Sequence, residues 1–194
     1  MNKLEQSDLL PLERYATERR AFRARVMAHK RPRAVELGKH VRLLFEDRLT
    51  VQYQVQEMLR IERIFESAGI QDELDAYNPL IPDGKNLKAT MLLEFTDAAE
   101  RARQLAGLVG IEHRIFAEVD GHPRIFARAD EDIDRSNSEK TSAVHFLRFE
   151  FPAQAMLALK SGASLSMGID DSRLREQTRV DVSVAAAIAQ DLTG

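Results

Sequence analysis

Apolar and polar residues alternate over several short stretches of this chain, and such alternation is typical of half-buried β-strands. Asp120-Gly121 separates two of these stretches and favours a type I′ turn, because both central residues of that turn need positive φ. We therefore expect a hairpin in which Val119 pairs with His122. The predicted strands are Ala34–Gly38, His40–Glu46, Lys88–Phe95, Ile111–Val119, His122–Arg128, Ala143–Phe151, Ser164–Ile169 and Arg179–Val182.

Other stretches repeat apolar residues at the spacing of a helix. Pro11 suits the first position of a helix that runs from Leu12 to about Lys30. The most regular helical pattern runs from about Leu49 to Ser67, and Gly69 follows it as a C-terminal signal. Shorter helices are predicted at Ala98–Leu105, at Pro152–Lys160 and from Ser183 to about Asp191.

These elements predict the α+β class. Several neighbouring strands are joined by turns too short for parallel crossovers, so we expect an antiparallel or mixed sheet of about seven or eight strands with helices packed on it. The length suits one domain over residues 1–194, with a basic helical segment over about residues 7–31. The helix from Leu49 is expected to pack on the sheet through an apolar stripe of Val51, Val55, Met58 and Phe65.

The composition of the chain excludes several kinds of functional site. The chain has no cysteine, which excludes thiolate zinc sites, iron–sulfur clusters, cysteine nucleophiles and disulfides within it. Its first residues lack the apolar stretch of a signal peptide, and no apolar run approaches the roughly 20 residues of a membrane helix. We therefore expect a soluble protein of a reducing compartment, the cytoplasm, with no membrane partner.

Charge is unevenly placed along the chain. The net charge is -3, which disfavours nucleic acid as a partner, yet residues 1–33 carry nine Lys and Arg against four Asp and Glu. One interpretation is a helix that docks an acidic protein partner or a second copy of this chain. The other is a solvated helix face that packs against the protein's own acidic remainder.

The familiar catalytic motifs are missing. There is no G-x-G-x-x-G, no G-x-x-x-x-G-K-[ST], no H-E-x-x-H and no G-x-S-x-G, so standard nucleotide-dependent chemistry is disfavoured.

Glu62 is the most informative anomaly, because a helical wheel places it in the middle of the apolar stripe of the helix from Leu49. A carboxylate that faces a core must be paired, protonated or bound to a metal. A structural ion pair with an inward-pointing arginine, such as Arg148 or Arg42, explains it most simply, and a ligand or acid–base role is the alternative.

Two histidines also fall on apolar faces of predicted strands, His113 on 111–119 and His145 on 143–151. Together with Glu62 they define a hypothetical metal site, since two histidines and a carboxylate with open positions suit non-haem Fe(II) or catalytic Zn²⁺. The simpler interpretation is two separate core histidines, each bonded to a backbone carbonyl or a carboxylate.

The opposite strand faces mix charged and apolar side chains, for example Arg148 and Glu150 beside Phe146. They predict either a solvent-facing sheet with cross-strand ion pairs or a polar pocket for an anionic small molecule. The acidic segment 129–140, with Asp130, Glu131, Asp132 and Asp134, is expected to be a solvated loop, or alternatively a lid over a site.

Four segments resemble the uncharacterised bacterial family known as domain of unknown function 3501: LLPLERY at 9–15, the block at 43–84, LVGIEH at 108–113 and KTSAVHFLRFEF at 140–151. The family has no established activity or site, so the resemblance assigns no functional residue. It implies genomic neighbours that resemble rubrerythrins and iron–sulfur oxidoreductases, and hence redox or iron proteins as partners.

Three functions follow as hypotheses. The first is an accessory protein that binds a metal ion or small ligand and serves iron or redox metabolism. The second is a metal-independent interaction module, as a homodimer or with an acidic partner. The third is a cofactor-free enzyme with a Glu/His acid–base pair.

Overall fold

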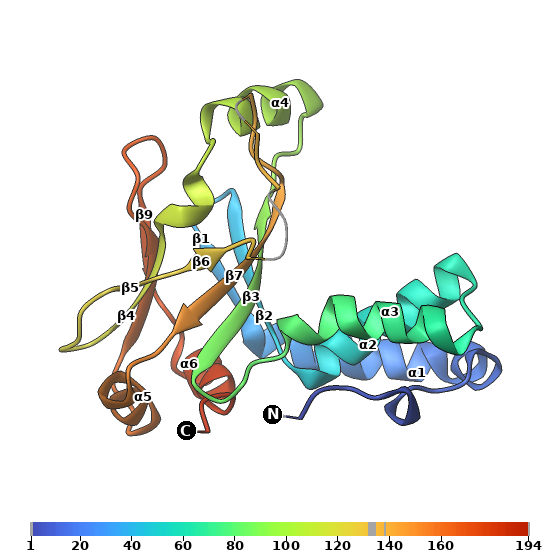
Figure 1. Cartoon of the computed structure of the whole chain (residues 1–194). Coiled ribbons are helices and arrows are strands. Elements are labelled where there is room, and N and C mark those ends of the chain that lie inside the picture. Colours follow the sequence, from blue (N-terminus) through green and yellow to red (C-terminus); the bar gives the residue numbers. More distant parts are fainter. Residues whose placement is uncertain (1, 132–134, 138, 194) are drawn as a thin grey trace.

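The computed structural model describes residues 2–131, 135–137 and 139–193, and within them the chain folds into six α-helices and nine strands. The strands form two antiparallel sheets that face each other, beside an arm of three helices (Figure 1). Sheet A has the order β1 (Ala34–Leu37), β2 (Val41–Glu46), β3 (Asn86–Leu93), β7 (Val144–Glu150) and β6 (Arg128–Ala129). Sheet B has the order β5 (Ile125–Phe126), β4 (Ile115–Val119), β8 (Leu165–Ile169) and β9 (Glu176–Arg179).

The α+β class is therefore confirmed, whereas the single sheet of seven or eight strands is wrong. The chain passes from sheet B to sheet A at Ala127, between β5 and β6. The predicted strand 122–128 spans this crossing. Alternation shows which side chains are buried, but it does not show on which sheet a strand pairs.

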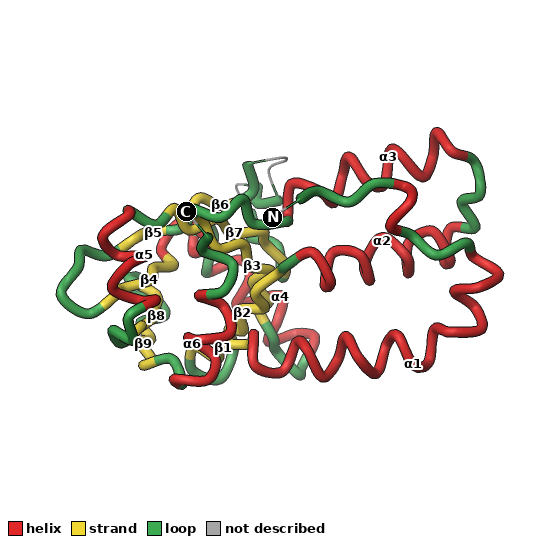
Figure 2. The backbone as a smooth tube through the Cα atoms, turned by 90° about the horizontal axis from the view of Figure 1, so that it is seen from below, coloured by secondary structure: helices red, strands yellow, loops and turns green. Residues whose placement is uncertain are grey.

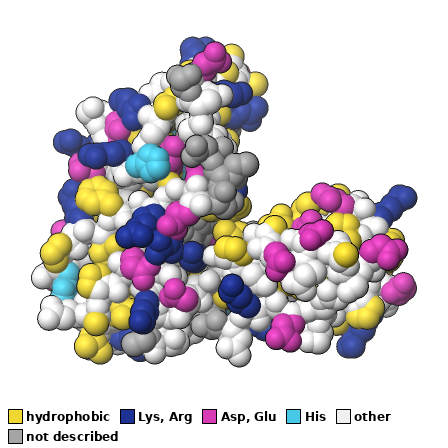
Figure 3. All heavy atoms as spheres, viewed as in Figure 1, with side chains coloured by type: hydrophobic (Ala, Val, Ile, Leu, Met, Phe, Trp, Pro, Cys, Tyr) yellow, Lys and Arg dark blue, Asp and Glu magenta, His cyan; other side chains and the backbone are white. Residues whose placement is uncertain are grey.

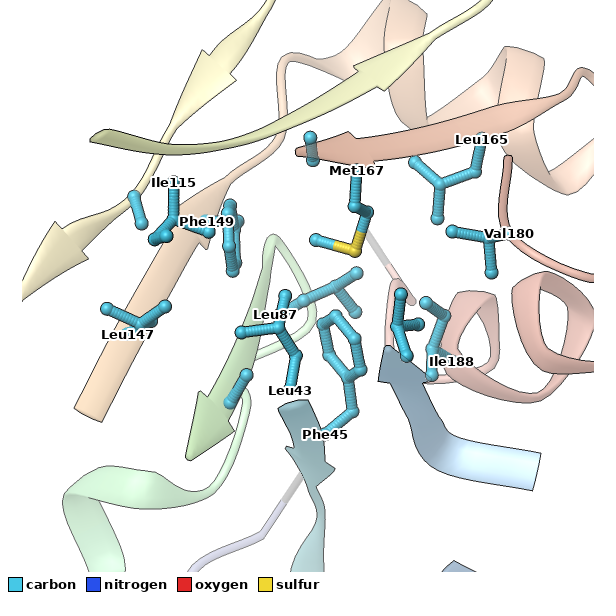
Figure 4. Close-up of a cluster of buried hydrophobic side chains, with 14 of the residues drawn as sticks. Leu43, Phe45, Leu87, Ile115, Leu147, Phe149, Leu165, Met167, Val180 and Ile188 are labelled. Atoms are coloured by element: carbon cyan, nitrogen blue, oxygen red, sulfur yellow. The ribbon is translucent and has the colours of Figure 1, made fainter. Parts of the chain in front are cut away.

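The main core lies between the two sheets. Phe45 and Phe149 of sheet A face Ile115 and Met167 of sheet B, and all four are almost fully buried (Figure 4). At one end of the sheets lie α5 (Ala153–Lys160) and α6 (Val182–Ala189), and α4 (Ala98–Gly107) lies at the other (Figure 1).

The arm consists of α1 (Leu12–Lys30), α2 (Arg48–Glu62) and α3 (Ser67–Tyr77), which run beside one another away from the sheets (Figure 2). It has its own apolar cluster, separate from the main core, built on Leu4, Val51, Val55, Leu59, Leu74 and Ile81. None of the described helices is long and apolar enough to cross a membrane.

The predicted helix from Leu49 to Ser67 is wrong in its end and in its packing. Arg63 adopts a left-handed conformation with φ 57° and stops α2 after Glu62, and α3 begins at Ser67, after four intervening residues. Gly69 therefore lies in the first turn of α3, a helix that the pattern did not predict. Phe65 is 63% exposed, and Val51 and Val55 pack within the apolar cluster of the arm instead of on the sheet.

The predicted hairpin exists, but its turn and register differ. Of the two central residues of the turn, Asp120 and Gly121, only Gly121 has positive φ (78°), so the turn is not type I′. Ile125 pairs with Ala117, whereas the predicted register places it opposite Phe116.

Residues Ile111–Arg114 form a 3-10 turn, labelled η4, instead of the start of a strand. Near the C-terminus, β9 (Glu176–Arg179) ends at the residue where the predicted strand 179–182 begins, and Val182 begins α6.

A buried polar junction joins the arm to the sheets and to the C-terminal segment. Arg33 is 3% exposed and bonds to the carboxylate of Asp191, to the carbonyl oxygen of Phe45 (3.2 Å) and, more distantly, to Asp47 (3.6 Å). Asp47 caps α2 by accepting from the N–H of Thr50 (2.9 Å). His29 of α1 lies 2.5 Å from the carboxylate of Asp47. The end of α1, the start of α2 and the C-terminal segment with Asp191 therefore meet around the guanidinium of Arg33.

This junction makes stability depend on pH. Burial raises the pKa of Asp191 to about 6, against an ordinary value of 3.8, although Arg33 opposes the rise. Between these values the folded protein holds a proton that the unfolded chain has lost, so the contribution of Asp191 to the free energy of unfolding falls as pH rises from about 4 to about 6. Urea unfolding across this range should show the fall in wild type and lose this component in Asp191→Asn. An unchanged slope in the variant would exclude Asp191 as its source.

Candidate metal centre

Three side chains that can ligate a metal converge at one end of sheet A. They are Glu112 on η4, Asp130 directly after β6, and His145 on β7. One ligand atom from each lies within 4.8 Å of the other two, and no other group of three among the described residues meets this condition.

His145 lies on the inward face of β7, where alternation predicted it, and its side chain is fully buried. Its Nδ1 is 2.5 Å from Oδ2 of Asp130. Its Nε2 is 2.9 Å from the hydroxyl oxygen of Thr141 and 3.0 Å from the carbonyl oxygen of Ser142. Both ring nitrogens therefore have partners, and the ring orientation is determined by the loop before β7 as well as by Asp130.

Asp130 is held by the strand beside it. Its backbone has φ 49°, a left-handed conformation that Asp and Asn tolerate better than most residues. Its N–H donates to the carbonyl oxygen of Phe146 (2.9 Å), and its Oδ1 accepts from the N–H of Phe146 (2.9 Å). Arg135 also pairs with Oδ1 (3.2 Å), which leaves Oδ2 directed at His145.

Glu112 is 3% exposed. Its carboxylate accepts from the hydroxyls of Ser136 (2.7 Å) and Thr141 (3.2 Å). Burial acts to raise the pKa of Glu112, but the hydrogen bond from Ser136 and the nearby His145 outweigh it, so this pKa lies below its usual value. Glu112 is therefore a carboxylate at neutral pH.

A cleft of about 300 Å³ gives access to this cluster. Its lining includes Gly110, Glu112, Asp130, Ser136 and Asn137. The hydroxyl of Ser136 in this lining contacts that of Thr141 (2.8 Å), and Thr141 lies 2.9 Å from Nε2 of His145, which is fully buried behind the lining. Oxygen ligands and an imidazole are the donor types that suit a hard or borderline divalent cation.

The three residues of the predicted metal site do not come together. Glu62 is exposed at the last position of α2 in the arm, three residues beyond Leu59, the last residue of this helix in the apolar cluster. The side chain of His113 is 64% exposed on η4, and its Nε2 reaches only to 3.9 Å from Glu112. His145 alone belongs to the observed cluster.

The alternation of apolar and polar residues does not indicate Glu112 or Asp130 as site residues. A 3-10 turn where a strand was predicted reverses the faces, so Glu112 points inward and its neighbour His113 points outward. Asp130 opens the acidic segment, yet only 6% of its side chain is exposed, so it is not part of a solvated loop. Asp132 and Asp134 of that segment lie outside the described residues.

Some of the basic residues among positions 1–33 bind acidic side chains of the same chain. Arg19 binds the carboxylate of Glu57 through two bonds (2.7 and 2.8 Å), and Arg33 is the centre of the buried junction. Arg20, Arg23 and Arg31 are exposed, so an acidic partner for this surface stays a prediction.

Fold and cluster together define a two-sheet α+β protein with a buried centre of one histidine and two carboxylates. The chain belongs to the family described as protein of unknown function DUF3501, whose model matches residues 3–192.

A solved structure supports the same fold. The chain is 53% identical to a protein from Burkholderia pseudomallei K96243, described as a novel protein of unknown function, whose crystal structure has a resolution of 1.90 Å. The similarity covers 98% of this chain and 100% of that one, with a TM-score of 0.94. None of the curated proteins compared with the chain matches it.

Proposed function

We propose that this protein is a metal-binding accessory protein that holds one divalent transition-metal ion through Glu112, Asp130 and His145. The observation that carries the proposal is the convergence of their ligand atoms within 4.8 Å, in a chain that has no cysteine to offer. One imidazole and two carboxylates suit Fe(II), Mn(II) or Zn²⁺ and leave coordination positions open toward the cleft.

The surroundings of the cluster support this role. Metal-ligating side chains are usually oriented by hydrogen bonds from a second layer of residues. Ser136 and Thr141 act in this way on Glu112, and Arg135 and the N–H of Phe146 on Asp130. Uptake of an ion that binds both Asp130 and His145 would break their 2.5 Å contact and release the proton between them.

The biological setting of the proposal is iron or redox metabolism in the bacterial cytoplasm. It rests on the family resemblance and its implied rubrerythrin-like neighbours, and the absence of cysteine is compatible with a reducing compartment.

Metal content tests the proposal directly. Untagged protein purified anaerobically without chelators should carry, or take up on titration, one equivalent of Fe(II), Mn(II) or Zn²⁺, measured by elemental mass spectrometry and calorimetry. Removal of one ligand in Glu112→Gln, Asp130→Asn or His145→Gln should weaken binding by about 100-fold or more, since loss of even an outer partner costs about 10–100-fold.

The chain offers matched controls. Glu62→Gln and His122→Gln remove a carboxylate and an imidazole that lie away from the cluster, and they should leave metal affinity unchanged. Protein that stays free of metal on titration with all three ions would refute the proposal. Equal weakening by Glu62→Gln would refute the assigned ligands.

A further inference from the structure

A second and larger cleft, of about 600 Å³, lies between the arm and the outer face of sheet A. The space-filling view shows the surface hollowed where the arm leaves the sheets (Figure 3). This volume is within the range of about 300–1,000 Å³ that is usual for small-molecule sites. Its apolar wall comes from Met58, Tyr77, Pro79 and Leu80, and Phe146 adds apolar surface on the side of the sheet.

The opposite wall is a row of three cations. Lys88 of β3 pairs directly with Arg148 of β7, and Arg148 pairs directly with Arg128 of β6. Directly paired residues share one face of a sheet, and like charges in that position repel each other. The row is therefore unfavourable for stability, although the net charge of the whole chain is negative.

The internal carboxylates neutralise only part of this wall. Arg148 is bound by Glu131 through two bonds (2.7 and 2.6 Å) and also by Glu150. The lining of the cleft contains two carboxylates, Glu131 and Glu73, and four cationic side chains. Within the part of the chain that the structure describes, the side chains of Lys88 and Arg128 make no hydrogen bond and no ion pair, and Glu131 and Glu150 act on Lys88 only at longer range.

Lys88 is only partly exposed, unlike Arg128. Burial and the adjacent Arg148 lower the pKa of Lys88. A half-buried ammonium that no described side chain pairs with, at the side of an apolar cleft, is destabilising unless a ligand supplies a closer negative charge.

We propose that this cleft binds a small amphiphilic anion, with its acidic headgroup on Lys88 and Arg128 and its apolar body against Met58, Tyr77 and Leu80. A carboxylate and a phosphate monoester share this chemistry. The site is distinct from the metal centre, because it contains none of Glu112, Asp130 and His145.

Calorimetry with octanoate and octyl phosphate tests the proposal, with octanol as the uncharged control and butyrate as the short one. We expect one of the two octyl anions to bind at least about tenfold more tightly than octanol and than butyrate, because a hydrogen bond to a charged group contributes about 1.5–3 kcal/mol. The anion that binds identifies the headgroup. Octanol binding as tightly as both anions, or no binding by either anion, would overturn the proposal.

Lys88→Met separates binding from folding. It should weaken binding of the preferred anion by about tenfold or more, while Lys85→Met, which removes an exposed charge just before β3, should not. Without ligand, Lys88→Met should keep or raise the melting temperature, because it removes a desolvated charge next to Arg148. A lower melting temperature with unchanged anion affinity would show that Lys88 is structural. Metal uptake by the same variant should be unaltered, so failure here and failure of the metal centre are distinguishable.

Discussion

Replacing Arg33 with methionine is expected to lower the free energy of unfolding by about 3–5 kcal/mol at neutral pH, as when one partner of a buried ion pair is removed. The substitution leaves the buried carboxylates of Asp191 and Asp47 without their guanidinium. It also removes the donor that Arg33 supplies to the carbonyl oxygens of Phe45 and Glu46. Urea unfolding followed by circular dichroism measures the loss.

Two comparisons test this explanation. Arg31→Met removes an exposed arginine two residues away and should change the free energy of unfolding by less than about 0.5 kcal/mol. Because the pKa of Asp191 is about 6, the loss of unfolding free energy caused by Arg33→Met should be smaller below that pH, where Asp191 becomes neutral. A defect as small as that of Arg31→Met, or one that is independent of pH, would contradict this account of the junction.

Truncation of Phe149 to alanine is expected to lower the free energy of unfolding by about 3–5 kcal/mol, the usual cost of emptying a buried aromatic site. Phe149 is fully buried between the two sheets, and its ring centroid lies 6.4 Å from that of Phe45. The resulting cavity would border both sheets, so the melting temperature should fall in a single transition.

The same substitution at an exposed site provides the control. Phe65→Ala, at the tip of the arm, should cost less than about 0.5 kcal/mol, because Phe65 is largely in water already. Similar losses in the two variants would mean that Phe65 is covered in solution or that the inter-sheet core tolerates the cavity.

Local pattern predicted most of the elements of this fold. Proline at position 11 and apolar spacing predicted α1 correctly, and alternation predicted β2, β3, β7 and β8 to within a few residues. It failed at positions where the backbone conformation determines where an element ends, because hydrophobicity does not indicate that conformation. Arg63 in a left-handed conformation divides one apparent helix into two, and no propensity indicates an arginine there.

The site was predictable only for the residue on a regular strand. His145 stands out because period-two alternation places an imidazole among apolar side chains. Glu112 and Asp130 lie on a 3-10 turn and at a strand end, where no fixed period relates neighbours to faces. Glu62 shows the opposite error, because a helical wheel assigns a face even to a residue at which the helix has ended.

The left-handed backbone at Asp130 limits which residues can occupy that position. Asparagine tolerates the conformation but has no charge, and glutamate has the charge but is poorly suited to the conformation. A ligand role there, in which the carboxylate stays beside His145, is therefore confined to aspartate alone. A substitution usually regarded as conservative, one that merely lengthens the side chain by a methylene, would therefore be unfavourable at this position.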